Sequence, residues 1–281
     1  MDLQFASETR SRTASRLPAR VAHPFGRMHL VRDGFLYAGL VAGVKSQRHS
    51  TLIYLSLDGS EFTVESGGER HRAAAMLVGP GVHKCLQGGA APLMCLDIFP
   101  THRSYRVFAH AHPAIQPWPR EHFCSIVDEL HAFHDGSMGL SAADRLHGQL
   151  VALAEERMPP LKPIDARVRE VMRLLRESHH RSMEELAEAV CLSKDWLVHL
   201  FQREAGISLR KFEQALKLQA AATYVNRGVS MTEVAANAGF ADSAHFSKLW
   251  KQHFGFPPRR LFVGTDLITV DPLPWPSCIQ R

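Results

Sequence analysis

Two stretches of the 281-residue chain place cationic and polar side chains at helical spacing, opposite apolar ones. One is SKDWLVHLFQREAG, which starts at Ser193, and the other is DSAHFSKLWKQHFG, which starts at Asp242. The first carries Gln202 and Arg203, and the second carries Lys248. Such groups donate hydrogen bonds to base edges and contact phosphates, and one α-helix fits the major groove of B-DNA. Each stretch is therefore predicted to be a helix that presents a polar face to double-stranded DNA.

An internal repeat positions these two helices. The hexapeptide SMEELA at residues 182–187 recurs as SMTEVA at residues 230–235, 48 positions later, and the shift becomes 49 after the following turn. Each copy is predicted to hold a short helix with a small central residue, a tight turn and a second helix, which is the build of a helix-turn-helix. Two such units joined by one helix suit two successive major-groove segments, roughly 34 Å apart.

The segment from residue 164 to residue 262 is predicted to be almost wholly helical. Ser182 and Glu185 fit a capping box at the start of one helix. Residues 209–226 are predicted to form one long helix that ends at Gly228. The segment holds 15 Lys and Arg against 11 Asp and Glu, so it carries +4 of the formal net charge of +5. This concentration of positive charge favours a nucleic-acid partner.

The second copy of the repeat carries a long motif. Residues 235–258 match A-x-x-x-G-F-x-D-x-x-x-F-S-x-x-W-K-x-x-x-G-x-x-P. Over roughly a hundred residues, the chain resembles the paired helix-turn-helix domain of the AraC/XylS family of bacterial transcription regulators. The resemblance implies a sequence-specific DNA-binding regulator, an activator by family habit, that responds to an effector. It also implies RNA polymerase as a partner and dimerisation through the first half of the chain.

The resemblance further implies which side chains face DNA. Early exposed positions of each second helix contact bases, and later positions lie nearer the phosphates. The implied base contacts are Lys194, Asp195, Val198 and His199 in the first unit and Ser243, Ala244, Ser247 and Lys248 in the second. The implied phosphate contacts are Gln202, Arg203 and Lys251. For His199 and His245, a cap or a solvent contact fits as well as a DNA contact does.

Some positions depart from the family pattern. Leu261-Phe262 stands where Tyr-Arg is frequent, and small side chains occupy base-contacting positions of the second unit where longer amides are common. These departures leave the predicted fold unaffected, but they leave the operator sequence unpredicted. The apolar residues of both helices are interpreted as core rather than as base-stacking groups. They are Trp196, Leu197, Leu200, Phe201, Phe246, Leu249 and Trp250.

The first half of the chain has a different period. Between residues 35 and 100, short apolar runs alternate with turn pairs such as Asp58-Gly59 and Gly67-Gly68, at the spacing of a small β-sandwich or barrel. Residues 120–156 return to helical spacing. Their apolar stripe either closes the β-rich half or pairs with a second copy of the chain.

A proline-rich break at residues 158–163 separates the halves. The predicted fold class is two-domain α+β. A β-rich, cupin-like jelly roll with flanking helices precedes an all-α domain with two helix-turn-helix motifs and a linker helix. The predicted units are a disordered tail at residues 1–20, a sensor and dimerisation domain at 21–160, a DNA-binding domain at 163–262 and a C-terminal tail at 263–281.

The β-rich half resembles the cupin-like sensor domain that many members of the same family carry. A metal-binding cupin brings three imidazoles and a carboxylate together. Only His49 and His83 stand at suitable positions here, so neither a metal site nor a cofactor is predicted. The candidate effector-binding residues, at the barrel mouth, are His49, Tyr54, His83 and Lys84. The competing interpretation of the two histidines is exposure to water at strand ends.

Composition also disfavours other classes of protein. No apolar run approaches the roughly 18 residues of a membrane-spanning helix, so no membrane partner is predicted. The five cysteines are widely spaced and form no C-x-x-C pair, which indicates a reducing cytoplasm. The predicted DNA binding adds an association with the nucleoid. Two alternatives to the regulator are a cupin-type or DNA-repair enzyme with a regulatory DNA-binding domain, and a non-specific architectural DNA binder. The enzyme lacks support, because the first half shows no cluster of reactive cysteines, so no enzyme is predicted. The presence of two distinct recognition helices disfavours the non-specific DNA binder.

Overall fold

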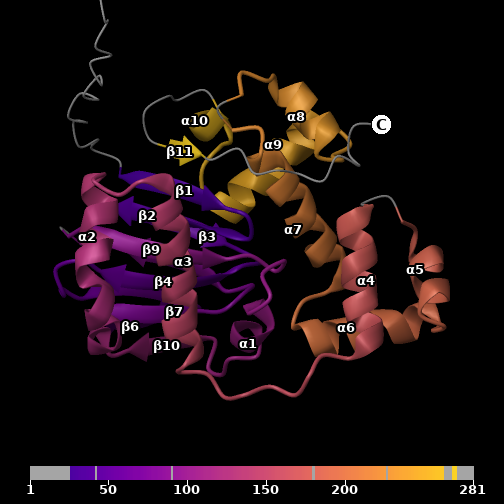
Figure 1. The fold of residues 1–281 in the computed structure, drawn as a ribbon, viewed down its shortest axis with the longest axis horizontal. Helices are drawn as coiled ribbons and strands as arrows, with labels where there is room; N and C mark the ends of the chain where they lie inside the picture. Colours follow the sequence, from indigo (N-terminus) through magenta and orange to yellow (C-terminus); the bar gives the residue numbers. More distant parts are fainter. Residues whose placement is uncertain are drawn as a thin grey trace, which may run out of the picture.

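The computed structural model describes residues 26–41, 43–89, 91–178, 181–225, 227–262 and 268–270. Strands predominate in the described residues before residue 119, and helices predominate after it (Figure 1). The β-rich region and the helical region lie side by side, so the predicted two-part α+β fold is confirmed. The predicted N-terminal tail, residues 1–20, lies outside the described residues.

Two sheets form the β-rich region. The larger has the strand order β10-β7-β4-β9-β2-β1-β11, and the smaller has the order β3-β8-β5-β6. Neighbouring strands are antiparallel except β1 and β11, which are parallel. The strands are β1 (Arg27–Val31), β2 (Gly34–Gly39), β3 (Val44–Gln47), β4 (Thr51–Ser56), β5 (Phe62–Ser66), β6 (Glu69–Ala73), β7 (Ala75–Val78), β8 (His83–Gln87), β9 (Leu93–Ile98), β10 (Ile115–Trp118) and β11 (Ile268–Val270). β11 lies within the predicted C-terminal tail.

The larger sheet is buried on both faces. In β4, Leu52 and Tyr54 belong to an apolar cluster that includes residues of the smaller sheet, whereas Ile53 and Leu55 belong to a second cluster with the helices. Side chains alternate between the faces of a strand, so a strand covered on both sides is apolar throughout. This explains why TLIYLS is entirely buried.

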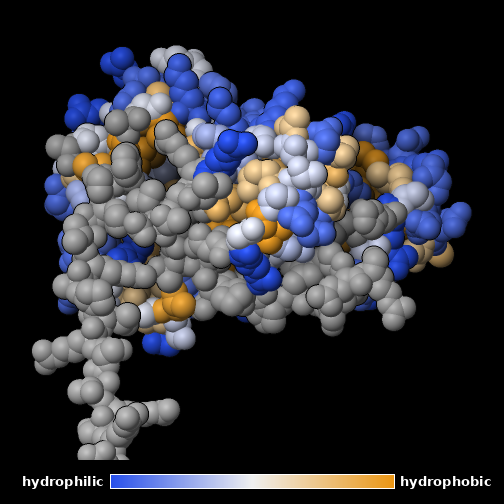
Figure 2. All heavy atoms as spheres, turned by 90° about the horizontal axis from the view of Figure 1, so that it is seen from above, coloured by the Kyte–Doolittle hydropathy of each residue, from blue (hydrophilic) through white to orange (hydrophobic). Residues whose placement is uncertain are grey.

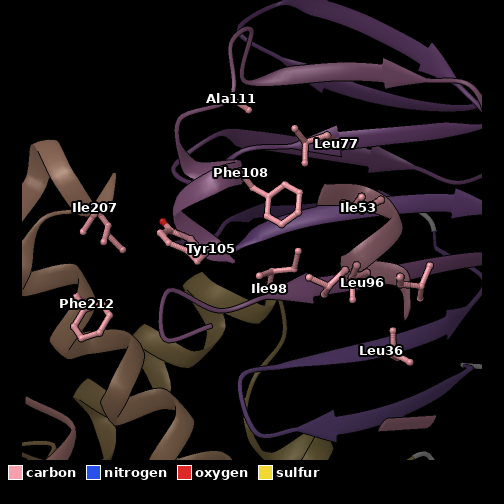
Figure 3. Close-up of a cluster of buried hydrophobic side chains, with 14 of the residues drawn as sticks. Leu36, Ile53, Leu77, Leu96, Ile98, Tyr105, Phe108, Ala111, Ile207 and Phe212 are labelled. Atoms are coloured by element: carbon pink, nitrogen blue, oxygen red, sulfur yellow. The ribbon is translucent and has the colours of Figure 1, made fainter. Parts of the chain in front are cut away.

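Helices close the outer face of the larger sheet. They are α1 (Tyr105–Ala109), η1 (Arg120–Ile126), α2 (Val127–Asp135) and α3 (Leu140–Glu155). Figure 3 shows Phe108 of α1 pointing at the strand residues Ile53 and Leu77. The apolar stripe of residues 120–156 is buried in the same cluster, so it closes the β-rich region rather than remaining exposed. Each square ångström of apolar surface buried here stabilises the folded state by about 25 cal/mol.

The helical region contains α4 (Ala166–Glu177), α5 (Met183–Ala189), α6 (Lys194–Ala205), α7 (Leu209–Ala222), α8 (Met231–Asn237), α9 (Ser243–Phe254) and α10 (Arg259–Phe262). α7 ends before the predicted limit of residue 226. The hydroxyl of Thr223 donates to the carbonyl of Ala220, and the next two amides bond three residues back instead of four. These tighter bonds end the α-helix with a turn.

Candidate nucleic-acid interface

The two repeat units begin with the same local chemistry. The hydroxyl of Ser182 accepts from the amide of Glu185, while the Glu185 carboxylate accepts from the amide of Ser182. Ser230 and Glu233 make the same reciprocal pair at the start of α8. The predicted capping box is confirmed, and the second copy repeats it.

The turn between the helices is also repeated. The amide of Leu192 donates to the carbonyl of Ala187 over 2.9 Å, and the amide of Phe240 donates to that of Ala235 over 2.9 Å. The residue before each donor is left-handed: Gly239 has a φ of 77°, and Cys191 has a φ of 53°. An L-residue pays a conformational cost there that glycine avoids. The shared backbone bond fixes how the second helix leaves the first in both units.

Each second helix is capped at both ends. Ser193 accepts from the amide of Trp196 at the start of α6, and Asp242 accepts from the amide of His245 at the start of α9. Both helices end at a left-handed glycine, Gly206 in one and Gly255 in the other.

The inner sides of α6 and α9 pack as predicted, with one exception. The buried residues are Leu197, Leu200, Phe201 and Ala205 in α6 and Phe246, Leu249, Trp250, His253 and Phe254 in α9. Trp196 was assigned to the core, and this prediction is wrong, because its side chain is 50% exposed. It lies four positions before Leu200, at the edge of the buried stripe, in the first turn of α6. Helical spacing suggested burial, but a position at the edge of the stripe leaves half of the residue exposed.

The predicted DNA contacts lie on the outer sides of the helices. Exposed residues are Lys194, Asp195, His199, Gln202, Arg203, Ala244, Lys248 and Lys251. Val198, Ser243 and Ser247 are half-buried. In Figure 2, polar side chains cover the end of the molecule formed by the first unit, with smaller apolar areas among them. The repeat thus gives each unit a buried inner side and a polar outer side.

One predicted contact already has a partner. The ammonium of Lys194 forms an ion pair with the carboxylate of Glu184 on α5, and this hydrogen bond lowers the pKa of Glu184. Solvent screens exposed pairs of this kind, so DNA can displace the carboxylate at little cost.

A buried polar cluster lies between the β-rich region and α9. Nη1 of Arg48 is 2.7 Å from the Asp97 carboxylate, and Nη2 donates to the carbonyl of Phe254 over 3.3 Å. The guanidinium also lies 5.3 Å from the ring centroid of Phe35. Burial raises the pKa of Asp97, and the nearby Arg48 cation opposes that shift. Arg48 therefore joins the interior of the sheets to the C-terminal end of the second recognition helix.

Two further basic groups face this pair. Burial, together with the nearby Arg48 cation, lowers the pKa of Lys84 to about 7, although Cys95 and Asp97 oppose the shift. Burial also lowers the pKa of His253 well below its ordinary value, helped by Arg48, His49 and Lys84. Neither ring nitrogen of His253 has a hydrogen-bond partner among the described residues. Buried groups with unfilled hydrogen-bonding capacity are unusual and indicate a site able to take a further polar group.

The structure brings three of the four predicted effector-binding residues to this cluster. His49 and Lys84 are buried beside His253, and buried Tyr54 is close enough to Arg48 and Asp97 for charge coupling. His83 is exposed, because it neighbours Lys84 in β8 and so points to the opposite face of the strand. The four residues therefore do not converge as a set.

Sequence reasoning missed Arg48, Asp97 and His253. A signal for Asp97 was available, since it is a lone carboxylate in the apolar strand LMCLDI, where burial requires a charged partner. The partner itself was not predictable, because Arg48 lies 49 positions away. His253 could not be recognised from the sequence, because it follows the polar residues Lys251 and Gln252 near the end of α9.

The C-terminal end of the first recognition helix is held differently. The Nε of Arg106, in α1, donates to the carbonyl of Glu204 over 2.6 Å, and Nη2 lies 3.6 Å from the Glu204 carboxylate. This pair is about one-fifth exposed. Gln219 of α7 donates to Asp33 over 3.0 Å and thereby adds a further contact between the regions.

Neither a metal-binding cluster nor a membrane-spanning helix occurs among the described residues. No group of three or more His, Cys, Asp or Glu side chains in this part of the chain could hold a metal ion. Among the same residues, no helix combines the length and hydrophobicity needed to cross a lipid bilayer.

The helical region is similar to the DNA-binding domains of known transcription regulators. Residues 186–262 match the family model described as a helix-turn-helix domain. The chain is 26% identical over 133 residues to the arabinose operon regulatory protein of Salmonella typhimurium, covering 46% of this chain and 47% of that protein. It is 33% identical over 86 residues to the transcriptional activator RhaS of Escherichia fergusonii, covering 30% of this chain and 31% of that protein.

These matches span less than half the length of either relative. Together with the repeated geometry, they confirm the predicted resemblance: the C-terminal region contains a helix-turn-helix domain similar to those of bacterial transcription regulators of the AraC/XylS family.

A solved structure has the same overall fold. ToxT from Vibrio cholerae aligns over 81% of this chain and 95% of its own, with a TM-score of 0.53 and 10% sequence identity. At this identity the likeness establishes the two-region fold alone.

Proposed function

We propose that this protein is a sequence-specific DNA-binding transcription regulator that acts in the cytoplasm, on the nucleoid, and is not an enzyme. The observation that carries the proposal is the repeated unit, which turns the polar sides of α6 and α9 outward at equivalent positions. Residues 163–262 would be the DNA-binding domain and residues 21–160 the sensor domain. Activation through RNA polymerase and pairing of two copies belong to the same proposal.

The DNA contacts proposed are those at the outward positions of α6 and α9. Cations on the second helix, Lys248 and Lys251, would face one major-groove segment, and Arg203 on the first would face the next. Asp195 would accept from a cytosine amino group, and the half-buried Val198 would offer apolar contact.

The effector is proposed to bind where the β-rich region meets α9. The buried cluster there holds the cation Arg48 and the partly protonated Lys84 against the carboxylate of Asp97, so an anionic group would be stabilised there and would favour the charged form of Lys84. Since Arg48 also donates to a carbonyl of α9, such a ligand would act directly on the second recognition helix. A ligand can shift the DNA-binding state only by its difference in affinity for the two states.

Selection from random duplexes tests the proposed function. The purified full-length chain would be mixed with a library of random 40-base-pair duplexes near physiological salt, and the retained DNA would be sequenced. We expect a motif with two blocks about one helical turn apart. Retention without any preferred sequence, lost steeply as salt rises, would contradict it and favour a non-specific binder.

A further inference from the structure

Trp196 is one of two large apolar side chains that are exposed among the described residues, the other being Leu40. They are 50% and 54% exposed, respectively. Leu40 lies at the end of β2, whereas Trp196 lies in the first turn of recognition helix α6. Within the described part of the chain, the indole N–H of Trp196 has no hydrogen-bond partner. Tryptophan is enriched at interfaces, because its large ring contributes apolar contact while its N–H can donate a hydrogen bond.

The position of Trp196 on α6 points to what covers it. His199 and Arg203 follow it at intervals of three and seven residues, and all three are exposed. Side chains at this spacing share one side of a helix. The tryptophan therefore belongs to an exposed row that ends in a cation and lies beside the buried stripe of Leu197, Leu200 and Phe201.

The second unit repeats this row. At the shift of 49 positions, His245, Lys248 and Gln252 occupy the corresponding places on α9, and all three are exposed. The same side of the recognition helix is thus turned outward in both copies, and in both it carries a cation. A polyanionic partner such as DNA explains why the row on each recognition helix carries a cation. The apolar ring of Trp196, in the row on α6, would then fit an apolar group on the same partner.

We propose that Trp196 is a specificity-determining residue that contacts the 5-methyl group of a thymine in the DNA segment read by α6. The thymine methyl is the apolar feature of the major groove, and side chains that contact it distinguish thymine from cytosine. The neighbouring Asp195, which can accept only from an amino group, discriminates at the adjacent position. This inference rests on the proposed function, because it needs a preferred DNA sequence.

The test uses the full-length chain and the duplex selected by it. Dissociation constants would be measured for the unaltered protein, Trp196→Ala and Trp196→Phe, on that duplex and on a scrambled one. Leu40→Ala is the matched control, since it removes an equally exposed apolar side chain far from α6. We expect Trp196→Ala to bind the selected duplex about tenfold more weakly, with little change on the scrambled duplex and an intermediate value for Trp196→Phe.

Deoxyuridine scanning then identifies the contact. Each thymine of the selected duplex is replaced in turn by deoxyuridine, which lacks only the methyl group. We expect one or two replacements, in the block read by α6, to weaken binding by the unaltered protein several-fold and to have no further effect on Trp196→Ala. That loss of additivity separates a methyl contact from a general loss of affinity.

Each other result has a distinct meaning. Equal affinity of Trp196→Ala and the unaltered protein for the selected duplex overturns the inference, as does an equal loss on both duplexes. Loss of transcription activation with unchanged DNA affinity also overturns it and assigns the ring to a protein partner. If the unaltered protein prefers no sequence, the proposed function itself fails, and this inference fails with it.

Discussion

The two helix-turn-helix units have the same backbone and different attachments. Both start with a Ser-Glu capping box, turn through a left-handed residue and end a capped recognition helix at a left-handed glycine. They differ at the C-terminal ends of the recognition helices. α9 ends against a fully buried ion pair, whereas α6 ends at a partly exposed one. Local sequence therefore determines the backbone that both units share. Contacts with the β-rich region make the ends of the two recognition helices different.

This inequality suggests how a signal reaches DNA. Arg48 touches both Asp97 in the sheet and Phe254 on α9, so a change in the buried cluster alters the second unit first. Arg106 holds the first unit from the outside of the sheet, through α1. The two major-groove contacts would respond differently to the same effector.

Removal of Arg48 should give the largest effect on stability. Arg48→Met leaves the Asp97 carboxyl buried without its cation, which we expect to lower the free energy of unfolding by about 3–5 kcal/mol. Denaturant unfolding measures this, with Arg106→Met as the matched variant in the first unit, where about 1 kcal/mol is expected. The double variant Arg48→Met/Asp97→Asn should recover part of the loss. Equal effects of the two arginine variants would contradict the inequality of the units.

Titration of Lys84 gives the next effect. Its pKa is about 7 in the folded chain and ordinarily 10.5, so between these values the unfolded state binds more protons and stability rises with pH. The raised pKa of Cys95, about 12 against an ordinary 9.0, has the opposite effect above pH 9. We expect the free energy of unfolding to rise by about 2 kcal/mol from pH 7 to 9. Lys84→Met should abolish most of this rise, and an unchanged rise would contradict the assignment.

A smaller effect should distinguish the two polar sides. Lys248→Ala should weaken binding to the selected duplex about tenfold, equivalent to about 1.4 kcal/mol, and relax its sequence preference. Arg203→Ala should weaken binding evenly across sequences and lower the salt slope by about one. Gel-shift titrations at several salt concentrations measure both, with the exposed Arg169 on α4 changed to Ala as the control. Unchanged affinity in both recognition-helix variants would disprove the assignment of DNA contacts.

The sequence predicted what depends on local spacing. The capping box at Ser182, the repeat and the helical stripes all follow from residues within a few positions of one another, so they could be predicted without tertiary contacts. The end of α7 was placed too late, because the Thr223 hydroxyl competes for a backbone carbonyl.

The buried cluster could not be predicted for a physical reason. Arg48 meets a carbonyl 206 positions away, and such a pairing leaves no period in the sequence. Trp196 shows a different failure, since helical spacing suggested burial while its place at the edge of the buried stripe leaves it half exposed. In both cases the error falls at the proposed functional surfaces, where sequences depart from rules that hold for stable cores.

The turn residues provide the smallest and most local contrast between the units. Cys191 is exposed and left-handed, whereas the second unit has Gly239 at the matching position. Cys191→Gly removes about 1–2 kcal/mol of conformational strain, but the added unfolded-state entropy costs about 0.5–1 kcal/mol, so we expect a net stabilisation of about 0–1.5 kcal/mol. Gly239→Ala should destabilise by a similar amount or more, because alanine takes on the strain that Cys191 already has. Thermal unfolding of both variants compares them, and two shifts of the same sign would show that the turns are not equivalent.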